Sequence, residues 1–302
     1  MCEVTATFAA PTTLADVLAA MAAGARPVAG GTDLVVGARQ GKKPLPPSLV
    51  AIHQLDELRA ITLTTTGLRI GALVSHEQIL ADATIRATYP ALADASAIVG
   101  SHATRAHGTL GGNVMTASPA MDTGSPLLCF GAIAILQSSS GTRSVPMDEL
   151  WTGPGRTVAE PHELLVAIDL PALAPGTSSC YVRLEYRRQM EIAIVGTGAQ
   201  VTIVDGVITD ARVAMTAVSA TIRRIAAAEQ ALVGTSGDRA AADAAGAAVS
   251  EACAPISDVR GSETYRRAMV GVIARRAIQS AVTRATGGTV PIPASPALHG
   301  AS

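Results

Sequence analysis

The sequence predicts an α+β fold of two domains that join near residue 175. Up to about residue 170, short apolar runs alternate with short helical patterns bounded by Gly, Pro, Ser or Thr. Residues 171–176 read Pro-Ala-Leu-Ala-Pro-Gly, a composition typical of a linker, and the strands and helices after it are longer. We therefore place the first domain at residues 1–175, the second at 176–286, and a mobile Pro- and Gly-rich tail at 287–302.

In the first domain, Thr12 or Thr13 can cap a helix over residues 14–21, whose apolar residues recur at the spacing of one helix face. A hairpin is expected because residues 61–63 and 68–72 flank a short polar turn. The other expected strands are 27–29, 49–52, 132–136 and 164–171, and the other expected helical segments are 76–81, 89–98 and 146–151.

In the second domain, three strands are expected to form an antiparallel meander, because Asp205-Gly206 is a typical hairpin turn. The strands are residues 179–186, 193–204 and 207–217, and helices are expected at 225–232, 239–252 and 262–284. The last helix is expected to be long and amphipathic, with one apolar side formed by Tyr265, Met269, Val272, Ile273 and Ile278.

Composition excludes several classes of function. The net charge of -1 argues against broad binding to nucleic acid or to an anionic membrane, and 2% aromatic residues provide few stacking platforms. The four cysteines form no C-x-x-C pair, so zinc and iron–sulfur spacings are absent and a reducing, cytoplasmic compartment is expected. Neither a signal peptide nor an apolar run of membrane-spanning length is expected.

Known catalytic patterns are also missing from the sequence. There is no G-x-S-x-G motif of a serine hydrolase. His102 and His107 stand five residues apart, whereas two histidine ligands on a helix are expected four apart, so polar loop histidines are the better interpretation. We therefore predict no catalytic residue and no metal ligand in this chain.

Two glycine-rich stretches carry the functional signal. Residues 109–122 contain Gly111-Gly112 among small polar side chains, end in Asp122, and include no lysine or arginine. Glycine allows positive φ, and successive free backbone N–H groups in such a turn can bind an anion. The alternative interpretation is a simple turn.

The other stretch, residues 26–37, which comes first along the chain, also pairs two glycines with a threonine and a carboxylate, before an apolar run that can open a helix. A helix N-terminus favours phosphate. Neither stretch is G-x-G-x-x-G or G-x-x-x-x-G-K-[ST], so a Rossmann dinucleotide site and a P-loop are disfavoured. Two such loops suggest a ligand long enough to touch both, such as a dinucleotide.

Taken in order, these motifs resemble the FAD-binding medium subunit of the molybdenum hydroxylases, the family of xanthine and carbon monoxide dehydrogenases. The similarity rests on Ala-Gly-Gly-Thr-Asp-Leu at 29–34, Thr-Leu-Gly-Gly-Asn at 109–113 and Ala-Ser-Pro-Ala-Met-Asp at 117–122. It extends to residues 71–73, 151–155, 188–193, 258–262 and 265–267, nearly the whole chain. Each motif alone is weak, but the ordered combination is specific.

The resemblance implies a two-subdomain FAD-binding fold of the vanillyl-alcohol oxidase (PCMH) type in the first domain. It implies a small antiparallel sheet with helices, of the CO dehydrogenase flavoprotein type, in the second. FAD would be held non-covalently, with its diphosphate between residues 29–34 and 109–113 and the glycines making room for it. The implied cofactor-binding residues are Pro27, Val28, Ala29, Gly30, Gly31, Thr32, Asp33, Leu34, Ser101, Thr109, Leu110, Gly111, Gly112, Asn113, Thr116, Ser118, Asp122, Leu165 and Arg183.

Three of these expectations concern charge. Asp122 is expected to accept from a sugar hydroxyl or the adenine amine, with an Asx-turn or helix cap as the alternative. The family commonly has lysine where Arg183 stands, so a positive charge is expected to remain beside a reduced, anionic flavin. The charged loop 184–192, with Arg187, Arg188 and Glu191, is expected near the flavin ring or as a solvated cluster.

As a function, the resemblance implies an electron-transfer subunit of a cytoplasmic oxidoreductase. A large molybdopterin-binding subunit would oxidise the substrate, and a small subunit with two [2Fe–2S] clusters would pass electrons to FAD in this chain. The external acceptor would be NAD⁺, a quinone or O₂, and the assembly a dimer of heterotrimers. The alternatives are a stand-alone flavin oxidoreductase, and a structural subunit with a vestigial flavin site.

Overall fold

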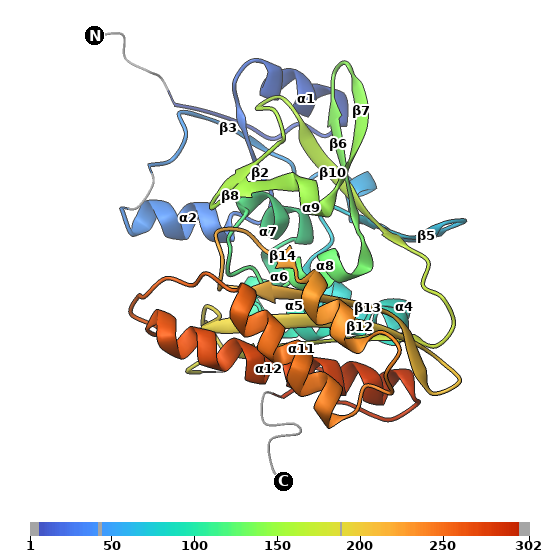
Figure 1. The fold of residues 1–302 in the computed structure, drawn as a ribbon. Helices are drawn as coiled ribbons and strands as arrows, with labels where there is room; N and C mark the ends of the chain where they lie inside the picture. Colours follow the sequence, from blue (N-terminus) through green and yellow to red (C-terminus); the bar gives the residue numbers. More distant parts are fainter. Residues whose placement is uncertain (1–5, 42–43, 188, 296–302) are drawn as a thin grey trace.

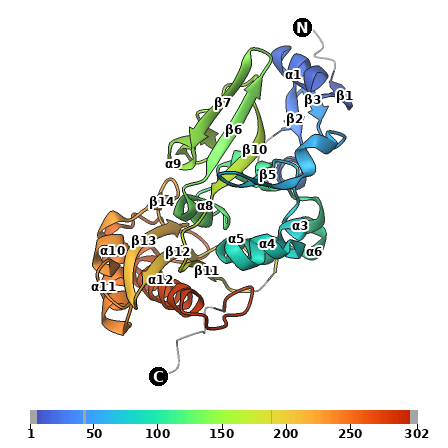
Figure 2. The ribbon, with the colours of Figure 1, turned by 90° about the vertical axis from the view of Figure 1, so that its right-hand side faces the viewer.

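The structure is a computed structural model that describes residues 6–41, 44–187 and 189–295. Figure 1 shows the two sheets of the first domain above and the C-terminal sheet with its helices below. In the view of Figure 2 the helices α3 to α6 lie beside the C-terminal sheet, on the side away from α11.

A small parallel sheet opens the fold, in the order β1-β3-β2, formed by β1 (Thr7–Ala9), β3 (Ser48–Ala51) and β2 (Arg26–Val28). Helix α1 (Leu14–Ala22) connects β1 to β2 and starts where the Thr13 hydroxyl accepts the N–H of Asp16. Its buried residues are the apolar ones that the spacing predicted, Val17, Leu18 and Met21. Helix α2 (Thr32–Arg39) follows β2 and has no buried residue.

The second sheet is antiparallel, in the order β4-β5-β10-β6-β7. Its strands are β4 (Ile61–Thr64), β5 (Gly67–Gly71), β10 (Leu164–Pro171), β6 (Ile133–Ser138) and β7 (Gly141–Pro146). The accompanying helices are η1 (Asp56–Arg59), α3 (His76–Ala81), α4 (Ala83–Thr88), α5 (Pro90–Ala97), α6 (His102–His107), α7 (Leu110–Thr116), α8 (Gly124–Phe130) and α9 (Met147–Leu150). A two-stranded sheet, β8 (Trp151–Gly153) with β9 (Arg156–Thr157), completes this part. The predicted hairpin of β4 and β5 is confirmed.

The C-terminal sheet has the order β11-β12-β13-β14, formed by β11 (Thr177–Leu184), β12 (Val195–Val204), β13 (Val207–Thr216) and β14 (Arg223–Arg224). Its helices are α10 (Ala226–Leu232), α11 (Arg239–Ala252) and α12 (Glu263–Ala285). The meander is confirmed, and Asp205 and Gly206 turn it with φ of 50° and 80°. Helices α5 and α8 of the first domain pack on this sheet together with α10 and α12. Gly198 of β12 allows the close approach of α8, because a Cβ there would lie 3.0 Å from the Ser125 backbone.

The apolar side expected for α12 is confirmed in part. Ile273 and Ile278 are buried, and Met269 packs against the same core, whereas Tyr265 is 43% exposed. Part of the segment expected as a tail packs on the rest of the chain: Val290 and Ala294 are buried, and the Asp94 carboxylate accepts the Ala294 N–H at 3.1 Å. Residues 296–302 of the expected tail lie outside the described residues.

In the ranges that the structure describes, no helix has both the length and the apolar character needed to cross a membrane. The same ranges hold no group of three or more His, Cys, Asp or Glu residues placed to bind a metal ion.

Candidate functional site

The first glycine pair forms the start of α2. Gly31 is its N-cap residue, with φ of 69°, and no side chain caps the helix. Within the described part of the chain, the backbone N–H groups of Thr32, Asp33 and Leu34 donate to no acceptor, and the first intrahelical bond is from Val35 to the Gly31 carbonyl. The first turn of a helix leaves such donors free for an anion, and its positive dipole end attracts one. The backbone donors at this helix start are therefore free, and the binding of an anion to them stays a prediction.

The second glycine pair differs from the prediction of a loop with free N–H groups. Thr109 caps α7, and its hydroxyl accepts the Gly112 N–H at 3.0 Å. The remaining N–H groups at the start of α7 are also used: Leu110 donates to the Val74 carbonyl, Gly111 to that of Ala72, and Asn113 to that of Thr109. An anion-binding concavity of backbone donors is therefore wrong for residues 110–113, because the helix and the neighbouring strand end take those donors.

Gly111 serves packing rather than ligand space. A Cβ at this position would lie 2.7 Å from both the Cβ and the carbonyl oxygen of Ala72, and the residue is buried. The segment after β5 thus presses against the first turn of α7. The sequence predicted that Gly111 makes room for a diphosphate. The structure gives a different reason for a glycine here, because a side chain at this position would point into the core.

The two glycine-rich stretches meet directly. A Cβ on Gly30 would lie 1.9 Å from the carbonyl oxygen of His107, so the backbones are in contact there. The Thr116 hydroxyl, at the end of α7, donates to Asp33 in the first turn of α2 at 2.9 Å. The first stretch thus contacts the residues on either side of 109–113, His107 and Thr116, and a ligand that touches both stretches stays a prediction.

A pocket of about 600 Å³ opens beside this contact. It is lined by Ala29 and Gly30 from the first stretch and by His107 and Thr109 from the second, with Leu73, Ser75 and Gln78 among the other lining residues. Its volume is within the range of small-molecule and cofactor sites. The junction of the two stretches thus has a cavity, which Gly30 lines two residues before the unpaired donors of α2 begin.

His76, at the start of α3, is buried near this pocket at 1% exposure. Burial, and then the positive charge of Arg105, lowers the pKa of His76 to about 4. In the unfolded chain the pKa is near 6.5, so the unfolded state gains a proton first as the pH falls.

We expect the lowered pKa of His76 to reduce the free energy of unfolding by up to about 3 kcal/mol as the pH falls from 6.5 to 4. Above pH 6.5 this loss is absent. Urea unfolding at pH 7 and pH 4.5 checks this, with His76→Gln as the comparison. The variant should lose less stability over this interval than the parent chain. Equal losses in the two proteins would contradict the assignment of the acid sensitivity to His76.

Further along, a buried group of four side chains connects the first domain to the C-terminal sheet. We call Asp122, Tyr181, Arg183 and Glu185 the charge cluster. Asp122 accepts the Tyr181 hydroxyl at 2.7 Å and Arg183 Nη1 at 2.8 Å. Glu185 accepts Arg183 Nε at 2.8 Å. The side chains of Arg183, Asp122 and Glu185 are 0%, 9% and 11% exposed.

The electrostatics of the charge cluster differ from the expected single positive charge. Burial raises the pKa of Asp122 to about 6, with Arg183 and the Tyr181 hydroxyl opposing the rise and Glu185 adding to it. Burial disfavours the charge on Arg183, but Asp122 and Glu185 hold the pKa of the guanidinium above its usual value. Two carboxylates therefore surround one guanidinium, and the cluster carries an excess of negative charge when all three are ionised.

One donor of the charge cluster lacks a partner. Arg183 Nη2 is buried and makes no hydrogen bond with the described residues. Nearby, the Thr123 hydroxyl donates to Asn113 Oδ1 at 2.6 Å, which ties the residue after Asp122 to α7. A buried guanidinium N–H without an acceptor is costly, so we expect an oxygen or nitrogen of a ligand to accept a hydrogen bond from Nη2.

The other predicted residues have structural partners of their own. Ser101 caps α6 by accepting the Thr104 N–H, and Ser118 accepts the Ala120 N–H. Leu165 is 3% exposed, beside an irregularity in the pairing of β10 with β6.

Asp122 caps no helix, so the alternative of a helix cap is wrong for it. In the charged loop, Arg187 pairs with Glu191 at 3.5 Å, and Arg188 lies outside the described residues.

Tyr181 and Glu185 are the site residues that the sequence reasoning missed. Both flank Arg183 at a spacing of two on or next to β11, so the three side chains lie on one side of the strand. Gly196 on the neighbouring strand makes the space, since a Cβ there would lie 2.4 Å from the Tyr181 hydroxyl. The sequence signal that could have identified Tyr181 and Glu185 was the presence of polar residues at alternate positions of an apolar strand.

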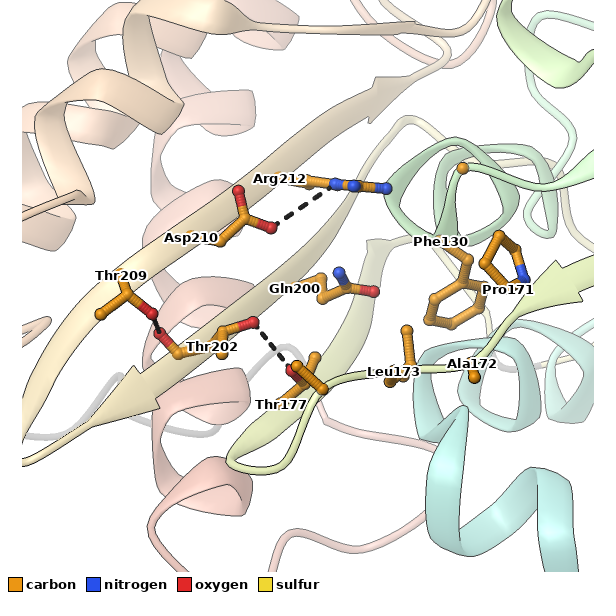
Figure 3. Close-up of a pocket in the computed structure, with 12 residues that line it drawn as sticks. Phe130, Pro171, Ala172, Leu173, Thr177, Gln200, Thr202, Thr209, Asp210 and Arg212 are labelled. Atoms are coloured by element: carbon orange, nitrogen blue, oxygen red, sulfur yellow. Dashed lines mark hydrogen bonds and ion pairs between the residues drawn. The ribbon is translucent and has the colours of Figure 1, made fainter. Parts of the chain in front are cut away.

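A second pocket, of about 570 Å³, lies between the segment that joins the domains and the C-terminal sheet (Figure 3). Gln200, Thr202 and Arg212 line it from the sheet, and Phe130 and Leu173 line the opposite side. None of the residues predicted to bind a cofactor lines this pocket.

Two family models match the chain, one in each half. Residues 4–173 match the FAD binding domain in molybdopterin dehydrogenase, and residues 181–281 match the CO dehydrogenase flavoprotein C-terminal domain. The carbon monoxide dehydrogenase medium chain of Afipia carboxidovorans is 31% identical over 278 residues, or 91% of this chain and 96% of that one. The xanthine dehydrogenase FAD-binding subunit of Escherichia coli O157:H7 is 30% identical over 279 residues, or 91% and 95%.

Solved structures show the same fold. A chain of reconstituted CO dehydrogenase from Oligotropha carboxidovorans superposes with a TM-score of 0.88 at 30% identity, covering 92% of this chain and 98% of that one. A chain of quinoline 2-oxidoreductase from Pseudomonas putida 86 gives 0.86 at 29% identity, covering 92% and 97%. The predicted fold class is therefore confirmed. On this evidence, the chain belongs to the family of FAD-binding medium subunits of the molybdenum hydroxylases, the FAD-containing subunits of these oxidoreductases.

Proposed function

We propose that this chain takes electrons from the [2Fe–2S] clusters of a partner subunit and delivers them, through bound FAD, to an external acceptor. The observation that carries the proposal is the set of unpaired N–H groups at the start of α2, two residues after Gly30, whose backbone contacts His107 beside a pocket of about 600 Å³. FAD, when bound, can exchange one or two electrons, which links single-electron clusters to a two-electron acceptor.

The residues present fit this cofactor at two separate places. The N–H groups of Thr32, Asp33 and Leu34 would hold the diphosphate, because they are free and lie at the positive end of a helix. The unpartnered Nη2 of Arg183 would donate to the flavin. Asn113, with its Oδ1 already held by Thr123, would keep its amide N–H₂ for the ligand.

The assembly is proposed on the same basis. The relatives are called a medium chain or an FAD-binding subunit, so we propose a large molybdopterin-binding partner and a small partner with two [2Fe–2S] clusters. We further propose a dimer of heterotrimers, an acceptor among NAD⁺, quinones and O₂, and the domain limits 1–175 and 176–286. The buried, free thiols of Cys129, Cys180 and Cys253 support a reducing, cytoplasmic location.

The visible spectrum of the purified full-length chain, before and after addition of FAD, tests the proposal. We expect a yellow protein that releases FAD on denaturation, and co-purification of iron–sulfur and molybdenum subunits from its native host. A colourless chain that takes up no added FAD would overturn the electron-transfer role.

A further inference from the structure

We propose that Glu185 is a positioning residue that lowers the reduction potential of FAD bound to this chain. It acts through Arg183, whose Nε it holds at 2.8 Å. The inference rests on the proposed function, because it places the flavin beside the charge cluster.

Glu185 determines the net charge of the charge cluster. Without it, Arg183 and Asp122 form a balanced pair, with 2.8 Å between Nη1 and Oδ2. With it, the buried cluster holds one guanidinium against two carboxylates. Reduction adds negative charge to a flavin, and a nearby excess of negative charge opposes that step most strongly where solvent is excluded.

The neighbouring charges include Arg260 and Arg266, which pair with Asp258 at 3.5 Å and 2.6 Å, and replacing Glu185 by glutamine removes one negative charge whatever these neighbours carry. Glu191 lies next to the cluster and pairs with Arg187 at 3.5 Å and with Arg260 at 3.8 Å. The Arg187 side chain is 68% exposed, so solvent and salt screen its charge. Glu185, at 11% exposure, is screened far less.

Glu185 also sets the direction of the remaining donor. Arg183 Nε is bound to Glu185 and Nη1 to Asp122, and this fixes the guanidinium plane and leaves Nη2 without a partner. The Tyr181 hydroxyl, at 2.7 Å, holds the other Asp122 oxygen. Arg183 would therefore donate to the flavin in a fixed orientation, with its positive charge already balanced by Asp122 and Glu185.

The test is the midpoint potential of FAD in the full-length chain, measured for the parent and for Glu185→Gln. Glutamine keeps an acceptor for Arg183 Nε and removes the charge. We expect the reduction equilibrium to shift toward reduced FAD by about tenfold or more, which for a two-electron couple is about 30 mV more positive. Glu185→Ala removes the same charge without the amide and should shift the potential in the same direction.

Glu229→Gln is the matched control. Glu229 is 13% exposed and also accepts an arginine Nε at 2.8 Å, from Arg224, but lies outside the charge cluster. The control should leave the potential unchanged. A parent chain that binds no FAD refutes the proposed function itself, whereas FAD-loaded parent and Glu185 variants of equal potential refute this inference alone. Loss of FAD from the Glu185 variants alone would assign Glu185 to cofactor binding and would also refute it.

Discussion

Replacing Gly30 by alanine is expected to weaken FAD binding at least about a hundredfold while the chain remains folded. The added Cβ would lie 1.9 Å from the carbonyl oxygen of His107 and 2.6 Å from its carbonyl carbon. Both atoms belong to the backbone, so no side-chain rotation relieves the overlap. The first glycine-rich stretch must move away from the second, and the free N–H groups of α2 move with it. Titration of the purified variant with FAD, followed by flavin fluorescence, measures the effect.

Gly37→Ala provides the control for this experiment. Gly37 lies in α2, and a Cβ there would have no atom within 4 Å. Alanine is a better helix former than glycine, so this variant should bind FAD normally and gain about 1 kcal/mol in stability. Wild-type FAD affinity in a folded Gly30→Ala chain would show that the contact with His107 does not shape the binding site.

Replacing Arg183 by methionine is expected to reduce the free energy of unfolding by about 3–5 kcal/mol, the usual cost of breaking a buried ion pair. The change leaves Asp122 and Glu185 buried without their cation, since the guanidinium is 0% exposed and bonds both carboxylates. Methionine fills much of the same volume, so lost packing is a minor contribution. Urea unfolding near neutral pH gives the measurement.

The comparison is Arg69→Met, which breaks the ion pair of Arg69 with Asp169. That pair is equally close, at 2.7 Å, but its side chains are 49% and 31% exposed. Exposed pairs contribute about 1 kcal/mol or less, so the loss should be small. Adding Asp122→Asn and Glu185→Gln to Arg183→Met should restore part of the stability by removing the unpaired charges. A loss in Arg183→Met no larger than that in Arg69→Met would contradict the role of the cluster.

Local sequence patterns determined the elements and several turns of this protein. The apolar spacing of residues 14–21 predicted α1 together with its buried residues, and Asp205-Gly206 predicted the hairpin between β12 and β13. These features depend on neighbours within a few positions along the chain, where helix caps, side-chain periodicity and positive φ are decided. The ordered glycine motifs also identified the family before any contact was known.

Only the tertiary structure decided what each glycine and each charge does. Gly30 and Gly111 stand in similar sequence surroundings, yet one meets the His107 backbone and the other meets Ala72 in the core. The N–H groups of Leu110 and Gly111 looked free because their acceptors, Val74 and Ala72, lie more than thirty positions away. Likewise, the sequence shows Arg183 as a positive charge. The fold surrounds it with Asp122 and Glu185, and in a buried site those long-range neighbours determine the net charge.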